Sequence, residues 1–172
     1  MSTLPKGVLP PSDAFPWPTL PVDIALLKLL SDRTVRPGNQ YEFGGKVGLD
    51  ADSSEVATSG IDCSGYVRWH LYRATNEAVT MPDGSAIQHE WVRETGFKES
   101  EIASACLLDG VLRIAFLAPQ GGKAGHVALV RNGLTFESNG GDGPNRRAWN
   151  GKGWQARTRV YVLTAPRTSA TA

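Results

Sequence analysis

Two residues of this 172-residue chain, Cys63 and His126, have types and positions that suit nucleophilic catalysis. Cys63 follows Asp62 at the start of a segment with apolar residues at helical spacing, so we expect its thiol at a helix N-terminus. The free N–H groups and the dipole of such a terminus favour the thiolate, which is the nucleophilic form of cysteine. The alternative is a small buried apolar residue, as most free cysteines are. Cys106 lies in an apolar run and is expected in the core.

A cysteine nucleophile needs a base, and the chain has three histidines. His70 and His89 lie in helical patterns beside apolar residues, where we expect structural roles. His126 differs because it begins a predicted strand directly after the glycine-rich segment 121–125. This position places its imidazole at the rim of a sheet, and His126 is therefore the predicted base.

The residues that orient His126 follow from a predicted hairpin. The dipeptide Asn132-Gly133 is typical of a two-residue turn between antiparallel strands. Counting outward from that turn, His126 shares one face of the sheet with Glu137 and Asn139, and either side chain can accept the imidazole N–H. The other interpretations are an exposed carboxylate for Glu137 and a turn residue for Asn139. A three-residue turn would reverse the parity of the strand.

The elements that must position these residues are three helices followed by an antiparallel sheet, which together predict an α+β domain. The helices are expected over 22–30, 63–75 and 86–95, and the strands over 111–118, 126–131, 134–139 and 159–163. A proline-punctuated arm over 1–20 precedes this domain at 21–165, and residues 166–172 are expected to form a flexible tail.

Composition and charge narrow the classes of function. Hydrophobic residues make up 41% of the chain, which excludes wholesale disorder, and the net charge of +1 argues against a nucleic-acid partner. The sequence shows neither a run of about 20 apolar residues nor a signal-peptide pattern, so we expect synthesis in the cytoplasm and no membrane insertion. The histidines and cysteines show no metal-ligand spacing, so no metal or cofactor is expected.

Four segments of the chain together resemble the NlpC family of papain-like cysteine peptidases, which cut the peptide stems of the bacterial cell wall. The segments are Tyr41-Glu42-Phe43-Gly44-Gly45, Asp62-Cys63-Ser64-Gly65-Tyr66-Val67, Met81-Pro82 through Ser85 to Gln88, and Gly125-His126-Val127-Ala128-Leu129-Val130. Their order and spacing fit the family over about residues 22–163. The resemblance implies a papain-like α+β fold with N-terminal helices packed on a small antiparallel sheet.

The resemblance also implies catalytic roles. Cys63 attacks the scissile carbonyl, and His126 is first the base and then the acid for the leaving amine. Tyr41 lies near the nucleophile, where its hydroxyl helps the Cys63 N–H to hold the oxyanion, or it is only a packing aromatic. The third polar residue of the family is often a second histidine. The hairpin turn here looks one residue shorter, which puts Glu137 in that place, with Asn139 in reserve.

The implied substrate is a peptidoglycan stem peptide, and the usual family bond joins γ-D-glutamyl to a diamino acid. Asp62 and Ser64 beside the nucleophile are the expected substrate contacts. Arg146 and Arg147 either meet substrate carboxylates or form a solvated basic loop. Two other functions stay open: a cysteine amidase or acyltransferase on a non-wall substrate, and a non-catalytic wall-binding or phage-tail module.

The missing signal peptide and wall-binding repeats favour a phage lysin or an injected antibacterial effector. Such a protein acts in the periplasm or cell wall after phage lysis or non-classical export, and an effector predicts a cognate immunity protein.

Overall fold

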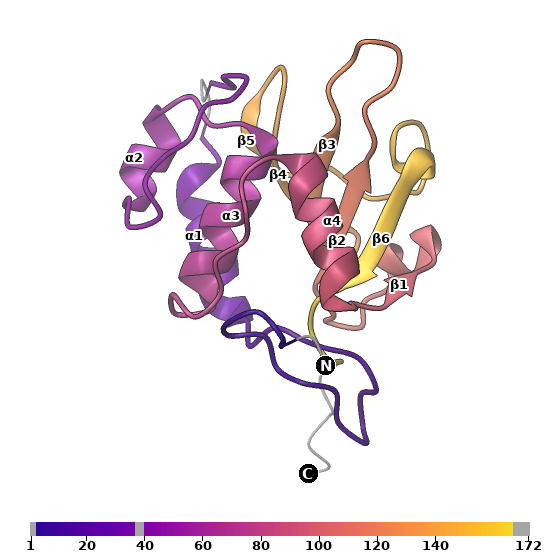
Figure 1. The fold of residues 1–172 in the computed structure, drawn as a ribbon. Coiled ribbons are helices and arrows are strands. Elements are labelled where there is room, and N and C mark those ends of the chain that lie inside the picture. Colours follow the sequence, from indigo (N-terminus) through magenta and orange to yellow (C-terminus); the bar gives the residue numbers. More distant parts are fainter. Residues whose placement is uncertain (1–2, 37–39, 167–172) are drawn as a thin grey trace.

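Helices cover one face of an antiparallel sheet in the computed structural model, which describes residues 3–36 and 40–166 (Figure 1). The four α-helices are α1 (Ile24–Thr34), α2 (Ser53–Thr58), α3 (Cys63–Ala74) and α4 (Ser85–Thr95). The α3 helix contacts α1 on one side and the strands β3 (His126–Arg131) and β4 (Leu134–Asn139) on another. The predicted α+β class is confirmed.

The sheet has six strands in the order β1-β6-β2-β3-β4-β5. Besides β3 and β4, the strands are β1 (Glu99–Ser100), β2 (Arg113–Leu117), β5 (Gly143–Asn145) and β6 (Thr158–Val162). The bounds of β3 and β4 are those predicted, whereas β2 is shorter at both ends and β6 begins and ends one residue earlier. The edge strands β1 and β5 were not predicted, because two or three residues are too few to show a period of two.

The hairpin between β3 and β4 has the predicted geometry. Asn132 and Gly133 have φ angles of 51° and 73°, so both occupy the left-handed region that a type I′ turn requires. The register pairs are Arg131 with Leu134, Val130 with Thr135 and Leu129 with Phe136. Extending this register to the start of β3 puts the side chains at positions 126, 137 and 139 on one face of the sheet.

Two helical segments differ from the prediction for local reasons. The α1 helix continues to Thr34 rather than 30, because Thr34 is buried and its hydroxyl bonds the Leu30 carbonyl and the Tyr66 hydroxyl. The last turn of α1 is therefore buried although its sequence is polar, which is why the hydrophobic pattern did not predict it. The α2 helix lies outside the three predicted helices, and it begins where the Asp52 carboxylate accepts the N–H groups of Ser54 and Glu55.

The core lies mainly between α3 and the sheet. Val67 and Leu71 of α3 share one buried cluster with Leu129 and Phe136 of the hairpin. A smaller cluster on the other face of the sheet includes Trp149 and lies beneath the short 3₁₀ helix η1 (Ile102–Cys106). The two predicted catalytic residues begin elements of this helix–sheet layer, Cys63 at the start of α3 and His126 at the start of β3.

The prediction that Cys106 belongs to the core is wrong. Cys106 is exposed, and its thiol donates a hydrogen bond to the Trp149 carbonyl at 3.3 Å. It ends η1, and the chain then leads through the exposed Leu107 and Leu108 toward β2, so the apolar run is a surface connection. Both cysteines are free thiols.

The N-terminal arm doubles back on itself. Leu9 pairs with Thr19, Leu20 donates to the Leu163 carbonyl, and the Lys98 ammonium lies 4.2 Å from the centre of the Trp17 ring. Residues 167–172, most of the predicted flexible tail, lie outside the described residues.

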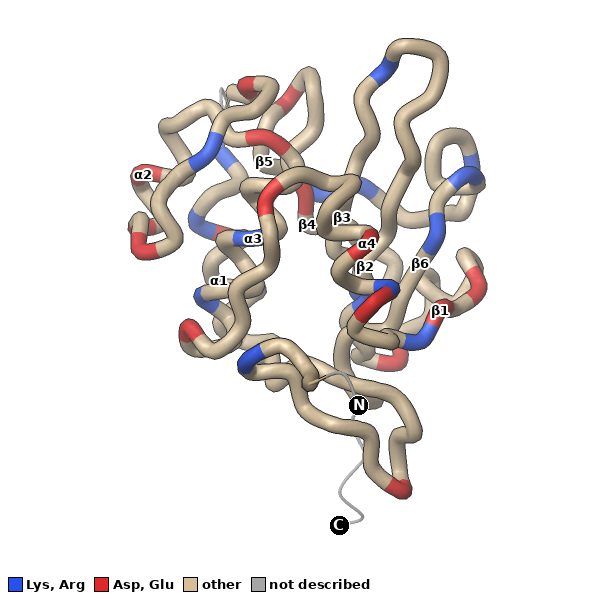
Figure 2. Tube along the Cα trace, viewed as in Figure 1, with Lys and Arg blue, Asp and Glu red and all other residues tan. Residues whose placement is uncertain are grey.

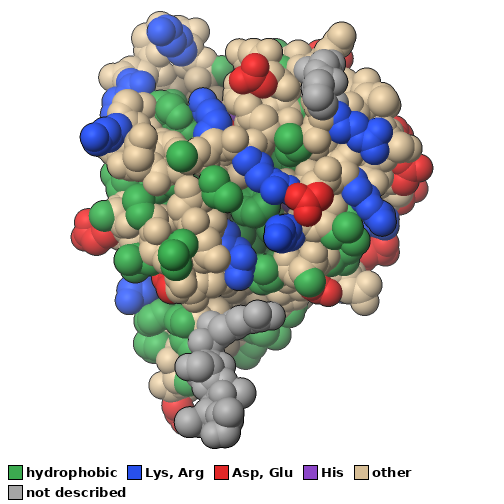
Figure 3. Space-filling view, turned by 180° about the vertical axis from the view of Figure 1, so that it is seen from behind, with side chains coloured by type: hydrophobic (Ala, Val, Ile, Leu, Met, Phe, Trp, Pro, Cys, Tyr) green, Lys and Arg blue, Asp and Glu red, His purple; other side chains and the backbone are tan. Residues whose placement is uncertain are grey.

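The surface is mixed in character. Basic and acidic residues are both scattered along the chain (Figure 2), and hydrophobic side chains on the rear face are interspersed with basic ones (Figure 3). Within residues 3–36 and 40–166, the structure has no helix long and apolar enough to cross a membrane.

Candidate active site

The N-terminus of α3 presents Cys63 as its first residue. Asp62 caps the helix: its carboxylate accepts the Gly65 N–H at 2.7 Å and the Ser64 hydroxyl at 2.9 Å. Cys63 is 5% exposed, which limits its solvation by water. The predicted position of the thiol at a helix N-terminus is confirmed, and it is the position at which backbone dipoles favour a thiolate.

The imidazole of His126 lies between Cys63 and a carboxylate. Its Nε2 donates to the Glu137 Oε2 at 2.5 Å, and the ring also makes a hydrogen bond with Cys63. Burial alone lowers the pKa of His126, but the hydrogen bonds to Cys63 and Glu137 and their negative charges raise it to about 9. At neutral pH the His126 ring is therefore an imidazolium beside the Cys63 sulfur, and an imidazolium can donate a proton to a leaving group.

The Glu137 carboxylate is fully buried, and both of its oxygen atoms accept hydrogen bonds. Arg147 binds it in a bidentate manner, with Nε 2.8 Å from Oε1 and Nη2 2.6 Å from Oε2, and the Thr135 hydroxyl donates to Oε1 at 2.5 Å. Burial raises the pKa of Glu137, but hydrogen bonds from Arg147, His126 and Thr135, with the charge of His126, lower it to about 2. Glu137 is therefore ionised at neutral pH and can only accept from His126.

The Trp154 side chain packs against both His126 and Arg147. Its ring meets the His126 ring edge to face, with 5.1 Å between centroids, and the Arg147 guanidinium lies 4.8 Å from its centroid. Sequence reasoning missed Thr135 and Trp154, since neither carries a motif. For Thr135 a signal existed, because it lies two residues before Glu137 and alternation puts both side chains on one face.

Tyr41 contributes a hydroxyl beside the nucleophile. Burial first, and then the negative charges of Cys63 and Asp62, raise the pKa of Tyr41 to about 12, so the phenol stays protonated and donates its hydrogen bond to Cys63. The segment that carries Tyr41 is fixed to α3, because the Gly45 carbonyl accepts the Asp62 N–H at 3.0 Å. A phenol so placed can also donate to an oxyanion formed at Cys63.

A lysine that sequence reasoning missed lies at the cap of α3. The Lys46 ammonium is 2.5 Å from the Asp62 Oδ2, 3.3 Å from the Ser64 hydroxyl and 3.4 Å from the Asp83 carboxylate. Asp62 and Ser64 are predicted substrate contacts, but in the structure they bind each other and Lys46, and Asp62 also caps the helix. Lys46 directly follows the Tyr41–Gly45 segment, and that proximity was the available signal.

The two arginines expected either to meet substrate carboxylates or to form a solvated basic loop have protein partners. Arg146 donates to the Ser31 hydroxyl at 2.9 Å and pairs with Asp32, both on α1, while Arg147 holds Glu137. The reserve orienting residue, Asn139, has a buried amide nitrogen without a hydrogen-bond partner among the described residues. The structure thus brings Glu137 into hydrogen-bond contact with His126.

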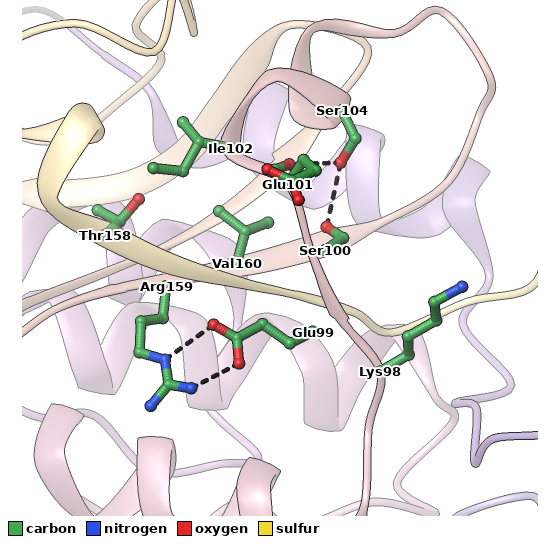
Figure 4. A pocket seen from close by; sticks show the side chains of 9 residues that line it. All are labelled: Lys98, Glu99, Ser100, Glu101, Ile102, Ser104, Thr158, Arg159 and Val160. Carbon is green, nitrogen blue, oxygen red and sulfur yellow. Dashed lines mark hydrogen bonds and ion pairs between the residues drawn. The ribbon is translucent and has the colours of Figure 1, made fainter.

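Two cavities differ in their relation to this cluster. One of about 440 Å³ lies between Phe43, which is 77% exposed, and the 119–124 segment that precedes His126. Its lining residues are thus close in sequence to Tyr41 on one side and to His126 on the other. The other, of about 540 Å³, lies near β1, β6 and η1 beside the Glu99–Arg159 ion pair (Figure 4). None of the described residues lining the second cavity is a cysteine or histidine.

The sequence matches the NlpC/P60 family over residues 38–162, and this protein belongs to that family. No functionally curated protein matches the chain in sequence.

Two solved structures are similar to it. One is an NLP/P60-family protein described as similar to lipoprotein, from Staphylococcus aureus subsp. aureus Mu50, with 18% identity and a TM-score of 0.49 over 83% of this chain and 43% of that chain. The other is the peptidoglycan hydrolase RipB from Mycobacterium tuberculosis, with 21% identity and a TM-score of 0.49 over 84% of this chain and 70% of that chain. This chain thus spans less than half of the staphylococcal protein.

Proposed function

We propose that this protein is a cysteine peptidase that cleaves an amide bond in peptidoglycan stem peptides. The observation that carries the proposal is the continuous chain of contacts from Cys63 through His126 to Glu137, with Cys63 at a helix N-terminus. Membership of the NlpC/P60 family supports the substrate class. The bond we propose joins γ-D-glutamyl to a diamino acid.

The reaction begins when the Cys63 thiolate attacks the scissile carbonyl carbon. The resulting oxyanion accepts hydrogen bonds from the Cys63 N–H and the Tyr41 hydroxyl. The His126 imidazolium donates its proton to the amine nitrogen as the C–N bond breaks, which leaves a thioester and a neutral imidazole. Water then attacks the thioester, His126 takes its proton, and the acid product leaves as the thiolate–imidazolium pair is restored.

Glu137, Arg147 and Thr135 fix the orientation of the His126 ring for this proton transfer. The Glu137 carboxylate holds Nε2, so the other ring nitrogen, Nδ1, is the one available to Cys63 and the leaving amine. Arg147 and Thr135 keep Glu137 charged and fixed in orientation, which stabilises the imidazolium without taking its proton.

The test is mass spectrometry of purified peptidoglycan digested by the wild type, by Cys63→Ala and by Cys106→Ala. The second variant removes the other, exposed thiol and serves as the matched control. We expect new stem-peptide termini with the wild type and Cys106→Ala and none with Cys63→Ala, and the masses identify the bond. An intact wall after wild-type digestion contradicts the proposal. An alkylation-reactive Cys63 would then favour an amidase or acyltransferase, and an inert one a binding module.

Delivery is a separate part of the proposal. We propose action in the periplasm or cell wall, reached by phage lysis or by injection from a secretion system, with a cognate immunity protein in the second case. Coexpression with the product of the neighbouring gene tests this: tight copurification that blocks peptidoglycan cleavage supports an injected effector. Free activity in the presence of that product contradicts it.

A further inference from the structure

A negative charge lies next to the nucleophile in the sequence and in space. The Asp62 side chain is 10% exposed and caps the helix that Cys63 begins. Its charge reaches the site, because it is one of the groups that hold up the pKa of the Tyr41 hydroxyl. A carboxylate this close to a thiolate opposes the thiolate charge unless a cation compensates it.

The compensating cation is Lys46. Besides contacting Asp62 and Ser64 with its ammonium, Lys46 lies with its stem along the first turn of α3. A Cβ atom added at Gly65 would be 3.0 Å from the Lys46 Cδ and 3.1 Å from the Gly45 carbonyl oxygen. Gly65 therefore leaves the space through which the lysine reaches the cap.

We propose that Lys46 is a positioning residue that neutralises Asp62 and so allows Cys63 to carry a negative charge at neutral pH. The inference rests on the proposed function, in which Cys63 is the nucleophile. His126 from β3 and the Tyr41 hydroxyl also interact with the Cys63 thiol. Among the residues that the structure describes, Lys46 is the cation that forms an ion pair with Asp62, so the compensation depends on Lys46.

The second ion pair of Lys46 provides a control. Asp83 is 54% exposed and lies 3.4 Å from the ammonium, whereas Asp62 is buried and lies at 2.5 Å. Solvent screens the exposed pair, so Asp83 should contribute little to the charge balance at Cys63. Asp83→Asn removes a partner of Lys46 without changing the charge on the helix cap.

The experiment measures the rate of iodoacetamide alkylation of Cys63 against pH, in a Cys106→Ser background so that only one thiol reacts. We expect Lys46→Met to raise the apparent pKa of the Cys63 thiol by about one unit, which is about tenfold slower alkylation below that pKa. Lys46→Arg and Asp83→Asn should keep the parent value.

Two further variants separate charge from structure. Asp62→Asn keeps a good helix cap but removes the charge, so alone it should lower the apparent thiol pKa. Combined with Lys46→Met it should restore the parent value, which a lysine with a merely structural role would not produce. An unchanged thiol pKa in Lys46→Met, or no restoration in the double variant, overturns the inference alone. A parent Cys63 that alkylates like an ordinary thiol overturns the proposed function as well.

Discussion

Replacing Glu137 by glutamine tests the electrostatic reasoning at the site most directly. The substitution keeps the size of the side chain but removes the charge that Arg147 and His126 share. The pKa of Glu137 is about 2 against an ordinary value of 4.5, a difference worth about 3 kcal/mol of folding free energy. Because the folded pKa is the lower one, this stabilisation is fully present above about pH 4.5 and is lost as the pH falls toward about 2.

The assay is urea unfolding of the wild type and Glu137→Gln at pH 7 and pH 3. We expect the variant to lose about 3 kcal/mol of unfolding free energy at pH 7 and clearly less at pH 3. Glu99→Gln is the matched control, because Glu99 forms the same bidentate pair with Arg159 but both side chains are about half exposed. Solvent screening should make its loss much smaller.

The same variant should change catalysis through His126. The Glu137 hydrogen bond and charge help to raise the pKa of His126 to about 9, so the alkaline limb of kcat/KM should lie near pH 9 in the wild type. In Glu137→Gln we expect that limb to move to lower pH by about 1 to 2 units, since the imidazolium loses its carboxylate. An unchanged limb together with an equal loss of stability at both pH values would refute the reasoning.

Three other substitutions give separate tests. Tyr41→Phe should lower kcat about 10²-fold with little change in KM, because it removes an oxyanion donor, and steady-state kinetics on a stem peptide would show this; an unchanged kcat makes Tyr41 a packing residue. Asn139→Ala should retain wild-type kcat/KM within a few fold in the same assay, since Glu137 is the residue bonded to His126; a loss as large as that of Glu137→Gln would assign the orienting role to both. Gly45→Ala should destabilise the fold severely, because its Cβ would lie 2.1 Å from a backbone oxygen. Gly141→Ala is the control: its Cβ would lie 3.7 Å from the nearest atom, so the urea midpoint should stay almost unchanged. Equal midpoints for the two glycine variants would contradict the packing around the Tyr41 segment.

Local sequence was sufficient for the nucleophile helix and the hairpin. The start of α3 at Cys63 is encoded by a capping aspartate followed by apolar residues at helical spacing, and both signals act within a few residues. The β3–β4 register is encoded by Asn132-Gly133, because a two-residue turn leaves one way to align the strands. The face shared by His126 and Glu137 follows from that register alone.

The charges around this framework were decided by tertiary structure. Arg147 reaches Glu137 because β5 turns the chain back along β4, and a three-residue edge strand leaves no periodic signal in the sequence. Lys46 and Asp62 are 16 residues apart and meet through the packing of a loop on α3. Cys106 is exposed because η1 ends at the surface, although its neighbours are apolar. Helix caps and tight turns depend on neighbours in the chain, whereas ion pairs and burial depend on which distant segments the fold brings into contact.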